Sequence, residues 1–288
     1  MNNSTVNFTT PEASTNSTTQ SIGLLDSLEI CVYSISFLFG LPTHIYVIWL
    51  IITGAGSGVA SEFFILNFSI SEAGFCVNCL TFVLSVWFSF IVQFKLFLVG
   101  LITTGRPLFQ SLICVERYLA VVHPVTFLKY KPLRYRVICC TVVWIIIFGS
   151  CLCCMYTIDE HNIVHMWFLS LQFLLFFFIQ LFCLVAVLRA LKQSGPGERG
   201  RARVEENYKK RRAFYLILIT TVTMVITYIP YSIGGFFTIA RTKLIPAYWF
   251  PGLVCYVLSG FVQPVLYLHR TGKLSCPVSY KTCYFNII

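Results

Sequence analysis

Apolar residues are gathered into seven long stretches that are separated by short polar segments. Each stretch exceeds the roughly 18 mostly apolar residues that indicate a helix crossing a bilayer. No segment between them is long enough to fold as a separate domain. The pattern therefore predicts an all-α membrane protein, a single bundle of seven transmembrane helices over residues 29–53, 62–87, 93–120, 136–156, 163–191, 211–240 and 246–268.

Composition supports this class. Only 11% of the residues are charged and 57% are hydrophobic, whereas soluble domains carry about 25% charged residues. Too few charged side chains are present to build the water-facing surface of a soluble domain of this length.

The net charge of +10 first suggests a nucleic-acid partner, but its distribution favours membrane topology. With the N-terminus outside and the helices alternating, sixteen Lys and Arg lie inside and three outside. Such an excess sets orientation by the positive-inside rule and attracts anionic membrane lipids. We therefore predict a cytoplasmic C-terminus and no nucleic-acid binding. The inside set is Lys129, Lys131, Arg134, Arg136, Arg189, Lys192, Arg199, Arg201, Arg203, Lys209, Lys210, Arg211, Arg212, Arg270, Lys273 and Lys281, and the outside set is Lys95, Arg241 and Lys243.

The N-terminal segment is polar and lacks the charged and apolar regions of a cleaved signal peptide. It contains four Asn-x-Ser/Thr acceptors for glycosylation, at Asn2, Asn3, Asn7 and Asn16. We expect a disordered, glycosylated extracellular tail over 1–28, a seven-helix domain over 29–270 and a short cytoplasmic tail over 271–288.

The thirteen cysteines fall mostly inside the predicted spans, where they act as small packing residues. None has the spacing of a zinc site, and Cys276 and Cys283 are candidates for palmitoylation. The acidic and histidine residues between 159 and 165 are interpreted as solvated loop groups. No spacing suggests a catalytic triad or dyad, so we expect neither a metal, nor a cofactor, nor an enzyme.

Two charged residues lie deep inside predicted spans. Arg106 lies eleven residues before Arg117, roughly 16 Å above the inner end of its helix at about 1.5 Å per residue. An unpaired arginine at that depth costs at least ~2.5 kcal/mol, and Glu72 lies at a matching depth in the second span. We predict a buried Glu72–Arg106 ion pair. The alternative, in which Arg106 snorkels or faces lipid, requires an unusually long reach.

Glu116-Arg117-Tyr118 closes the third span in the stretch "ERYLAVVHPV". With seven spans and an outside N-terminus, the chain resembles a divergent class A, rhodopsin-like G-protein-coupled receptor. The resemblance implies that Glu116 holds Arg117 at rest and that Arg117 is released toward the G protein on activation. It also implies that Val125 packs into the α subunit of a heterotrimeric G protein.

Other landmarks extend the resemblance along the chain. "TYIPYS" places Tyr228 where the family has a switch tryptophan, and Pro230 at the kink of the sixth helix. "QPVLYL" places Gln263, Pro264 and Tyr267 on the family's Asn/Asp-Pro-x-x-Tyr motif. These five residues are therefore the expected activation switches.

The departures from the family pattern are as informative. Glu72 and Arg106 stand where many relatives have an aspartate and a small serine that belong to a sodium site, so Arg106 is expected to replace sodium. Phe176 stands in for a kink proline and Leu184 for a tyrosine. The disulfide that ties the third helix to the second extracellular loop is absent from its usual place.

The resemblance implies a plasma-membrane receptor that couples an extracellular ligand to a G protein. The candidate ligand contacts lie in the outer half, where two cations suggest an anionic ligand. A receptor-fold protein that does not couple normally (a decoy, a partner or a constitutively biased relative) remains an alternative. A transporter is disfavoured because neither an internal repeat nor a pair of interrupted helices is seen. The candidate contacts are Tyr33, Gln172, Tyr228, Tyr231, Arg241, Lys243 and Tyr248.

Overall fold

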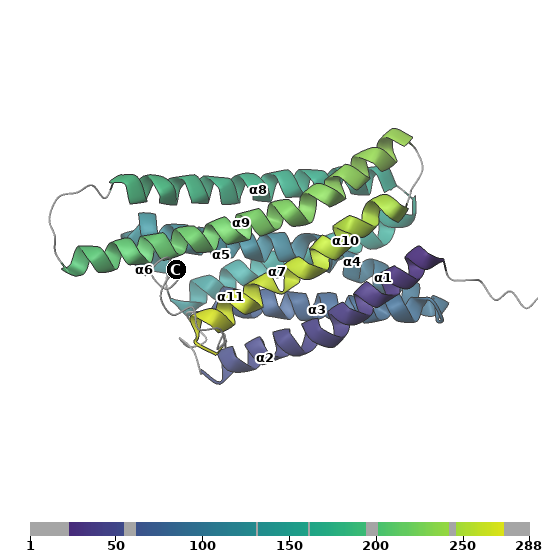
Figure 1. The fold of residues 1–288 in the computed structure, drawn as a ribbon, viewed down its shortest axis with the longest axis horizontal. Coiled ribbons are helices and arrows are strands. Elements are labelled where there is room, and N and C mark those ends of the chain that lie inside the picture. The colour runs from purple at the N-terminus through teal and green to yellow at the C-terminus, as the bar shows by residue number, and fades with distance from the viewer. Residues whose placement is uncertain are drawn as a thin grey trace, which may run out of the picture.

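The computed structural model describes residues 23–54, 62–130, 132–160, 162–193, 201–241 and 246–273, and every element in them is helical. The helices run alternately along one long axis as a bundle (Figure 1). In chain order they are α1 (Leu24–Ile35), η1 (Ser36–Gly40), α2 (Leu41–Ile52), α3 (Phe63–Ser85), η2 (Ser89–Ile91), α4 (Val92–Gly100), η3 (Leu101–Gly105), α5 (Arg106–Val122), α6 (Pro124–Tyr130), α7 (Leu133–Glu160), α8 (Asn162–Gln193), α9 (Arg201–Arg241), α10 (Pro246–Gly260) and α11 (Val262–Arg270).

Seven segments of these helices are long and apolar enough to cross a membrane, which confirms the seven expected spans. Several helices extend beyond the expected limits, α7 by three residues at its start and four at its end, and two others by more at their start. The first begins at Leu24 rather than at 29, and α9 begins at Arg201 rather than at 211. Backbone hydrogen bonds form as readily in polar sequence as in apolar sequence, so a helix continues past the point at which hydropathy falls. The seven segments are Leu24–Ile52, Phe63–Ser85, Ser89–Val122, Leu133–Tyr156, Ser170–Lys192, Lys210–Gly234 and Phe250–Arg270.

The third span changes its helical geometry just before Arg106. The π-helical turn η3 separates α4 from α5, and Pro107 occupies the first turn of α5. Proline has no N–H and its ring collides with the carbonyl four residues earlier, so an α-helical turn here would lose a hydrogen bond. The extra residue of a π turn rotates the following helix, which changes the face that Arg106 occupies.

Small residues bring helices into backbone contact. At Gly100 a Cβ atom would lie 2.3 Å from Cys151 Cα and 2.4 Å from Cys151 N. Helices α4 and α7 therefore touch main chain to main chain, as small residues allow in membrane bundles. At Gly149, which like Cys151 lies on α7, a Cβ atom would meet nothing within 4 Å.

Apolar packing divides the interior into two larger clusters and one smaller cluster. One joins α2, α3, α5 and α7 around Phe68 and Phe109, and a second joins α3, α8, α9 and α10 around Tyr256. The smallest, around Val187 and Ile217, lies near the end of the bundle at which α5 ends. We call this end of the bundle the Arg117 end; α3 begins there, and α2 and α11 end there.

Candidate functional site

Arg106 and Glu72 form a bidentate ion pair in the centre of the bundle. The side chains are 1% and 2% exposed. Arg106 Nε donates to Glu72 Oε1 at 2.7 Å and Arg106 Nη2 donates to Oε2 at 2.5 Å. Parallel N–H···O⁻ bonds of this kind are the strongest form of carboxylate recognition by arginine. Arg106 thus faces the interior of the bundle and not the lipid.

The remaining nitrogen of Arg106 reaches a third helix. Nη1 donates to the carbonyl oxygen of Tyr256 at 2.5 Å and to Ser259 Oγ at 2.8 Å, both on α10. Arg106 Cζ lies 3.7 Å from the centroid of the Tyr256 ring, a cation–π contact that strengthens when water is excluded. One side chain from α5 therefore links α3 with α10. We call Glu72, Arg106, Tyr256 and Ser259 the arginine hub.

Gly260 completes the hub by leaving room for it. A Cβ atom at Gly260 would lie 2.9 Å from Arg106 Nη2 and 3.1 Å from Glu72 Oε2. Sequence reasoning found the ion pair but missed the contribution of α10. The available signal was the Ser259-Gly260 pair, a hydroxyl beside a residue without a side chain, just ahead of the Gln263-Pro264 motif.

At the Arg117 end, Glu116 pairs with a different arginine from the one that the resemblance implies. Arg136 Nη2 of α7 lies 2.6 Å from Glu116 Oε1. Successive residues of an α-helix point about 100° apart, so Glu116 faces α7 while Arg117 points to a different side of α5, toward α9 and α11. Within the described part of the chain, Arg117 forms no hydrogen bond or ion pair.

A second ion pair joins the start of α3 to the end of α11. Glu62 Oε1 contacts Arg270 Nη2, and Glu62 is 3% exposed. Tyr118, next to Arg117, has its hydroxyl 3.0 Å from Nε2 of His123. Val125 on α6 is 81% exposed, which leaves an apolar side chain available at this end of the bundle.

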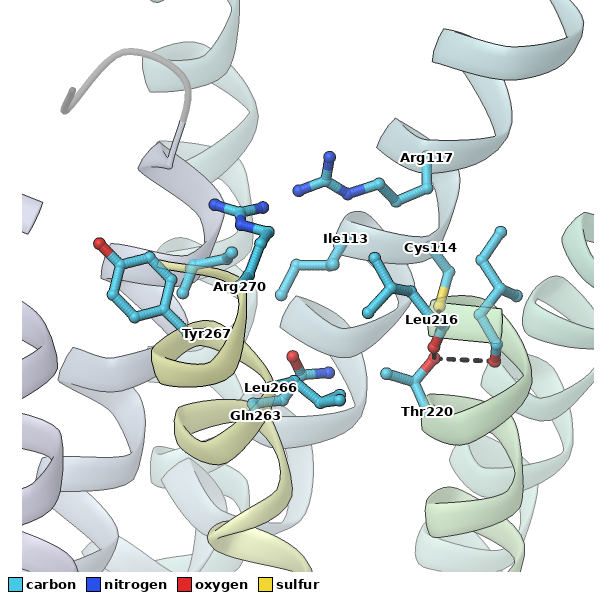
Figure 2. A pocket seen from close by; sticks show the side chains of 11 residues that line it. Ile113, Cys114, Arg117, Leu216, Thr220, Gln263, Leu266, Tyr267 and Arg270 are labelled. Atoms are coloured by element: carbon cyan, nitrogen blue, oxygen red, sulfur yellow. Dashed lines mark hydrogen bonds between the residues drawn. The ribbon is translucent and has the colours of Figure 1, made fainter. Parts of the chain in front are cut away.

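Arg117 and Arg270 line a small, partly open recess between α5, α9 and α11. Figure 2 shows the two guanidinium groups directed toward each other across its mouth. Gln263 and Tyr267 contribute to one wall and Thr220 of α9 to the other. We call this cavity the Arg117 recess.

The expected switch residues are divided between the two sites: Tyr228 contacts the hub, and Gln263 and Tyr267 line the recess. Tyr228 is 8% exposed and stacks on Phe173 with ring centroids 5.5 Å apart. Its ring meets Tyr256 of the hub edge-on at 6.3 Å. Pro230 lies inside α9, and α11 buries Gln263, Pro264 and Tyr267. A chain of contacts therefore connects Tyr228 to the hub.

The expected ligand contacts that the structure describes pack against neighbouring helices in one half of the bundle. Gln172 Nε2 donates to Thr104 Oγ1 at 3.1 Å. Tyr33 packs on Phe82 at 4.1 Å and Tyr231 packs on Tyr256 at 5.9 Å between ring centroids. The other expected positions lie outside the described residues or side chains; they are Arg241, Lys243, Tyr248, Asn2, Asn3, Asn7, Asn16, Cys276 and Cys283.

Eleven cysteines fall in the described residues, and no disulfide joins any two of them. No group of three or more His, Cys, Asp or Glu side chains in the described residues is arranged to hold a metal ion. The side chains at 157–166 are not described.

Comparison with known proteins identifies receptors of one class. No protein-family model matches the chain. It is 28% identical over 224 residues to the mouse (Mus musculus) chemokine XC receptor 1, which covers 72% of this chain and 66% of the receptor. It is 24% identical over 238 residues to the rat (Rattus norvegicus) uracil nucleotide/cysteinyl leukotriene receptor, which covers 74% and 68%.

A third relative is human (Homo sapiens) G-protein coupled receptor 35, with 28% identity over 149 residues, which covers 47% of this chain and 46% of the relative. The chain thus spans two thirds or less of the length of several relatives that it matches. These relatives are receptors and not enzymes. The chain is therefore a multi-pass membrane protein and a divergent homologue of the class A, rhodopsin-like G-protein-coupled receptors of the plasma membrane.

Proposed function

We propose that the chain is a signalling receptor, with its N-terminus outside the cell and the Arg117 end in the cytoplasm. One observation carries the proposal. Arg117 projects into a recess between α5, α9 and α11 and is not held by Glu116. In the part of the chain that the structure describes, most Lys and Arg fall on helix ends at this same end of the bundle, the distribution expected of a cytoplasmic surface.

In this proposal the Arg117 recess receives a heterotrimeric G protein. Arg117 supplies the charged contact, and the exposed Val125 of α6 supplies an apolar contact beside it. An extracellular ligand would bind at the opposite end, near Tyr33, Gln172 and Tyr231. Its signal would reach the recess through the contact of Tyr228 with Tyr256 and through α11. Such coupling requires two packings of the bundle whose populations the ligand shifts.

A second candidate function is a receptor-fold protein that does not couple in the ordinary way. The arginine hub favours it, because a buried bidentate pair with two further hydrogen bonds to α10 holds three helices together. A bundle held in one packing would act as a decoy, a partner or a constitutively biased relative.

Substituting Arg117 with alanine separates the two functions. In the coupling receptor, ligand-free dissociation of the G protein should fall to background, because the recess loses its free cation. The measurement is G-protein dissociation in cells across the main Gα classes, at equal surface levels of wild type and Arg117→Ala. Equal activity of the two proteins above background would contradict the proposed role of Arg117. Silence of both at good surface levels would favour the second function.

Sodium should have no specific effect on the protein. The guanidinium of Arg106 already supplies a cation to Glu72, and Gly260 leaves no further space beside the pair. Basal activity should therefore stay constant when sodium is exchanged for N-methyl-D-glucamine at constant ionic strength, with potassium as a second control. A response to sodium that neither potassium nor the organic cation reproduces would disprove this replacement.

A further inference from the structure

The Arg117 recess has more positive than negative charge. Arg117 and Arg270 line the recess, and Arg136 lies nearby on α7. Each of the two nearby carboxylates forms an ion pair with one of these arginines. Glu116 is paired with Arg136, and Glu62 is paired with Arg270. Arg117 therefore remains as a cation without an ion pair in the described residues, and it is only partly exposed. A partly buried cation without a partner is costly and attracts an anion.

The charge of Arg270 adds to that of Arg117. The two residues line the same recess, and the positive charge of Arg270 acts on Arg117, against the larger and opposite effect of the nearby Glu116. Their guanidinium groups point toward each other across the mouth (Figure 2). Like charges that face one another are stabilised when an anion lies between them, because each then gains an opposite charge at short range.

A buried amide provides a further donor. Gln263 is 6% exposed, and its Nε2 has no hydrogen-bond partner. Figure 2 shows its amide directed into the recess, below the two guanidinium groups. A buried N–H without an acceptor has lost its bond to water and gained none in the protein, so it favours the binding of an acceptor. Thr220 does not compete for the same position, because its hydroxyl donates to carbonyl oxygens of its own helix.

We propose that the Arg117 recess is a binding site for one oxyanion, a carboxylate or a phosphate. Arg117 and Gln263 would donate hydrogen bonds to it, and Arg270 would contribute charge from the α11 side. Charge-assisted hydrogen bonds of this type are about twice as strong as neutral ones. The recess is small: it has about 30 Å³ of space for the centres of water-sized atoms, and one water needs roughly 10–15 Å³ of such space. It therefore suits the oxygens of one carboxylate or phosphate group and not a larger molecule. The anion comes either from solution or from the headgroup of an anionic lipid.

Thermal unfolding of the full chain tests the site. The protein is purified and placed in nanodiscs of neutral phosphatidylcholine, and inorganic phosphate is titrated against chloride at fixed ionic strength and pH. Phosphate should raise the Tm of the wild type by about 3 °C, because a ligand that binds only the folded state stabilises it. In Arg117→Ala and in Gln263→Leu the phosphate concentration for half of the effect should rise at least about tenfold, because each loses a charge-assisted hydrogen bond to the anion.

The matched control is Lys192→Ala, which removes one positive charge from an exposed position outside the recess. Its response to phosphate should equal that of the wild type. A second set of nanodiscs with phosphatidylglycerol and no phosphate identifies the source of the anion. Stabilisation that depends on Arg117 only in these nanodiscs assigns the site to a lipid headgroup, and stabilisation in both sets assigns it to any accessible oxyanion.

Two results would overturn the proposal. One is a phosphate or lipid effect of the same size in the wild type and in both recess variants. The other is no effect on the wild type in either set of nanodiscs. Neither result depends on a G protein, so a failure of the oxyanion site is distinguishable from a failure of coupling in cells.

Discussion

Arg106→Ala should leave little folded protein at the cell surface. The substitution leaves Glu72 buried, charged and without its partner, and it also removes both hydrogen bonds to α10. Removal of one member of a buried ion pair costs about 3–5 kcal/mol, a large fraction of the ~5–15 kcal/mol that stabilises a typical folded protein. Surface staining of an epitope-tagged chain and the Tm of the detergent-solubilised protein measure the loss.

The double variant Glu72→Gln/Arg106→Gln tests whether the loss arises from the stranded charge. Two neutral amides in the same place retain some hydrogen bonds and leave no buried charge, so surface level and Tm should recover in part. Equal surface levels for the wild type, the single variant and the double variant would show that the pair does not stabilise the bundle.

Much of the fold was predictable because each membrane span appears in the sequence as a long run of apolar residues. Apolar runs do not record where a helix ends in water, and so the start of α9 at Arg201 was missed. The depths of Glu72 and Arg106 in the membrane could also be predicted, because both follow from a count of residues from the helix ends. The part played by Tyr256 could not, because its hydrogen bond to Arg106 uses a backbone carbonyl, which every residue possesses, and its ring contact depends on how α10 packs against α5.

The partner of Glu116 shows a different limit of sequence reasoning. Glu116 and Arg117 are adjacent in the chain, and the family resemblance implies that the acid holds the arginine. On a helix the two side chains point in different directions, and a residue on α7 with the right reach takes the acid. The packing of α5 on its neighbours decides which arginine becomes the partner of Glu116. The consequence is functional, because an Arg117 without its acid is available to an anion or to a partner protein.

The contact between α4 and α7 provides the second large effect. In Gly100→Ala the added Cβ would lie 2.3–2.6 Å from main-chain atoms of Ser150 and Cys151. A flexible side chain could move aside, but the backbone of a packed helix cannot, so the two helices must separate along the contact. Overpacking in a core costs about 1–3 kcal/mol and occasionally more, and we expect the upper end of this range.

The Tm of Gly100→Ala should therefore fall by roughly 6 °C or more, at about 2–4 °C per kcal/mol for a chain of this size. Gly149→Ala is the matched control, because it makes the same change on α7 with nothing within 4 Å of the new atom. It should be neutral or slightly stabilising, since alanine is favoured over glycine inside a helix by about 0.5–1 kcal/mol. If both variants melt with the wild type, the two helices are not in main-chain contact.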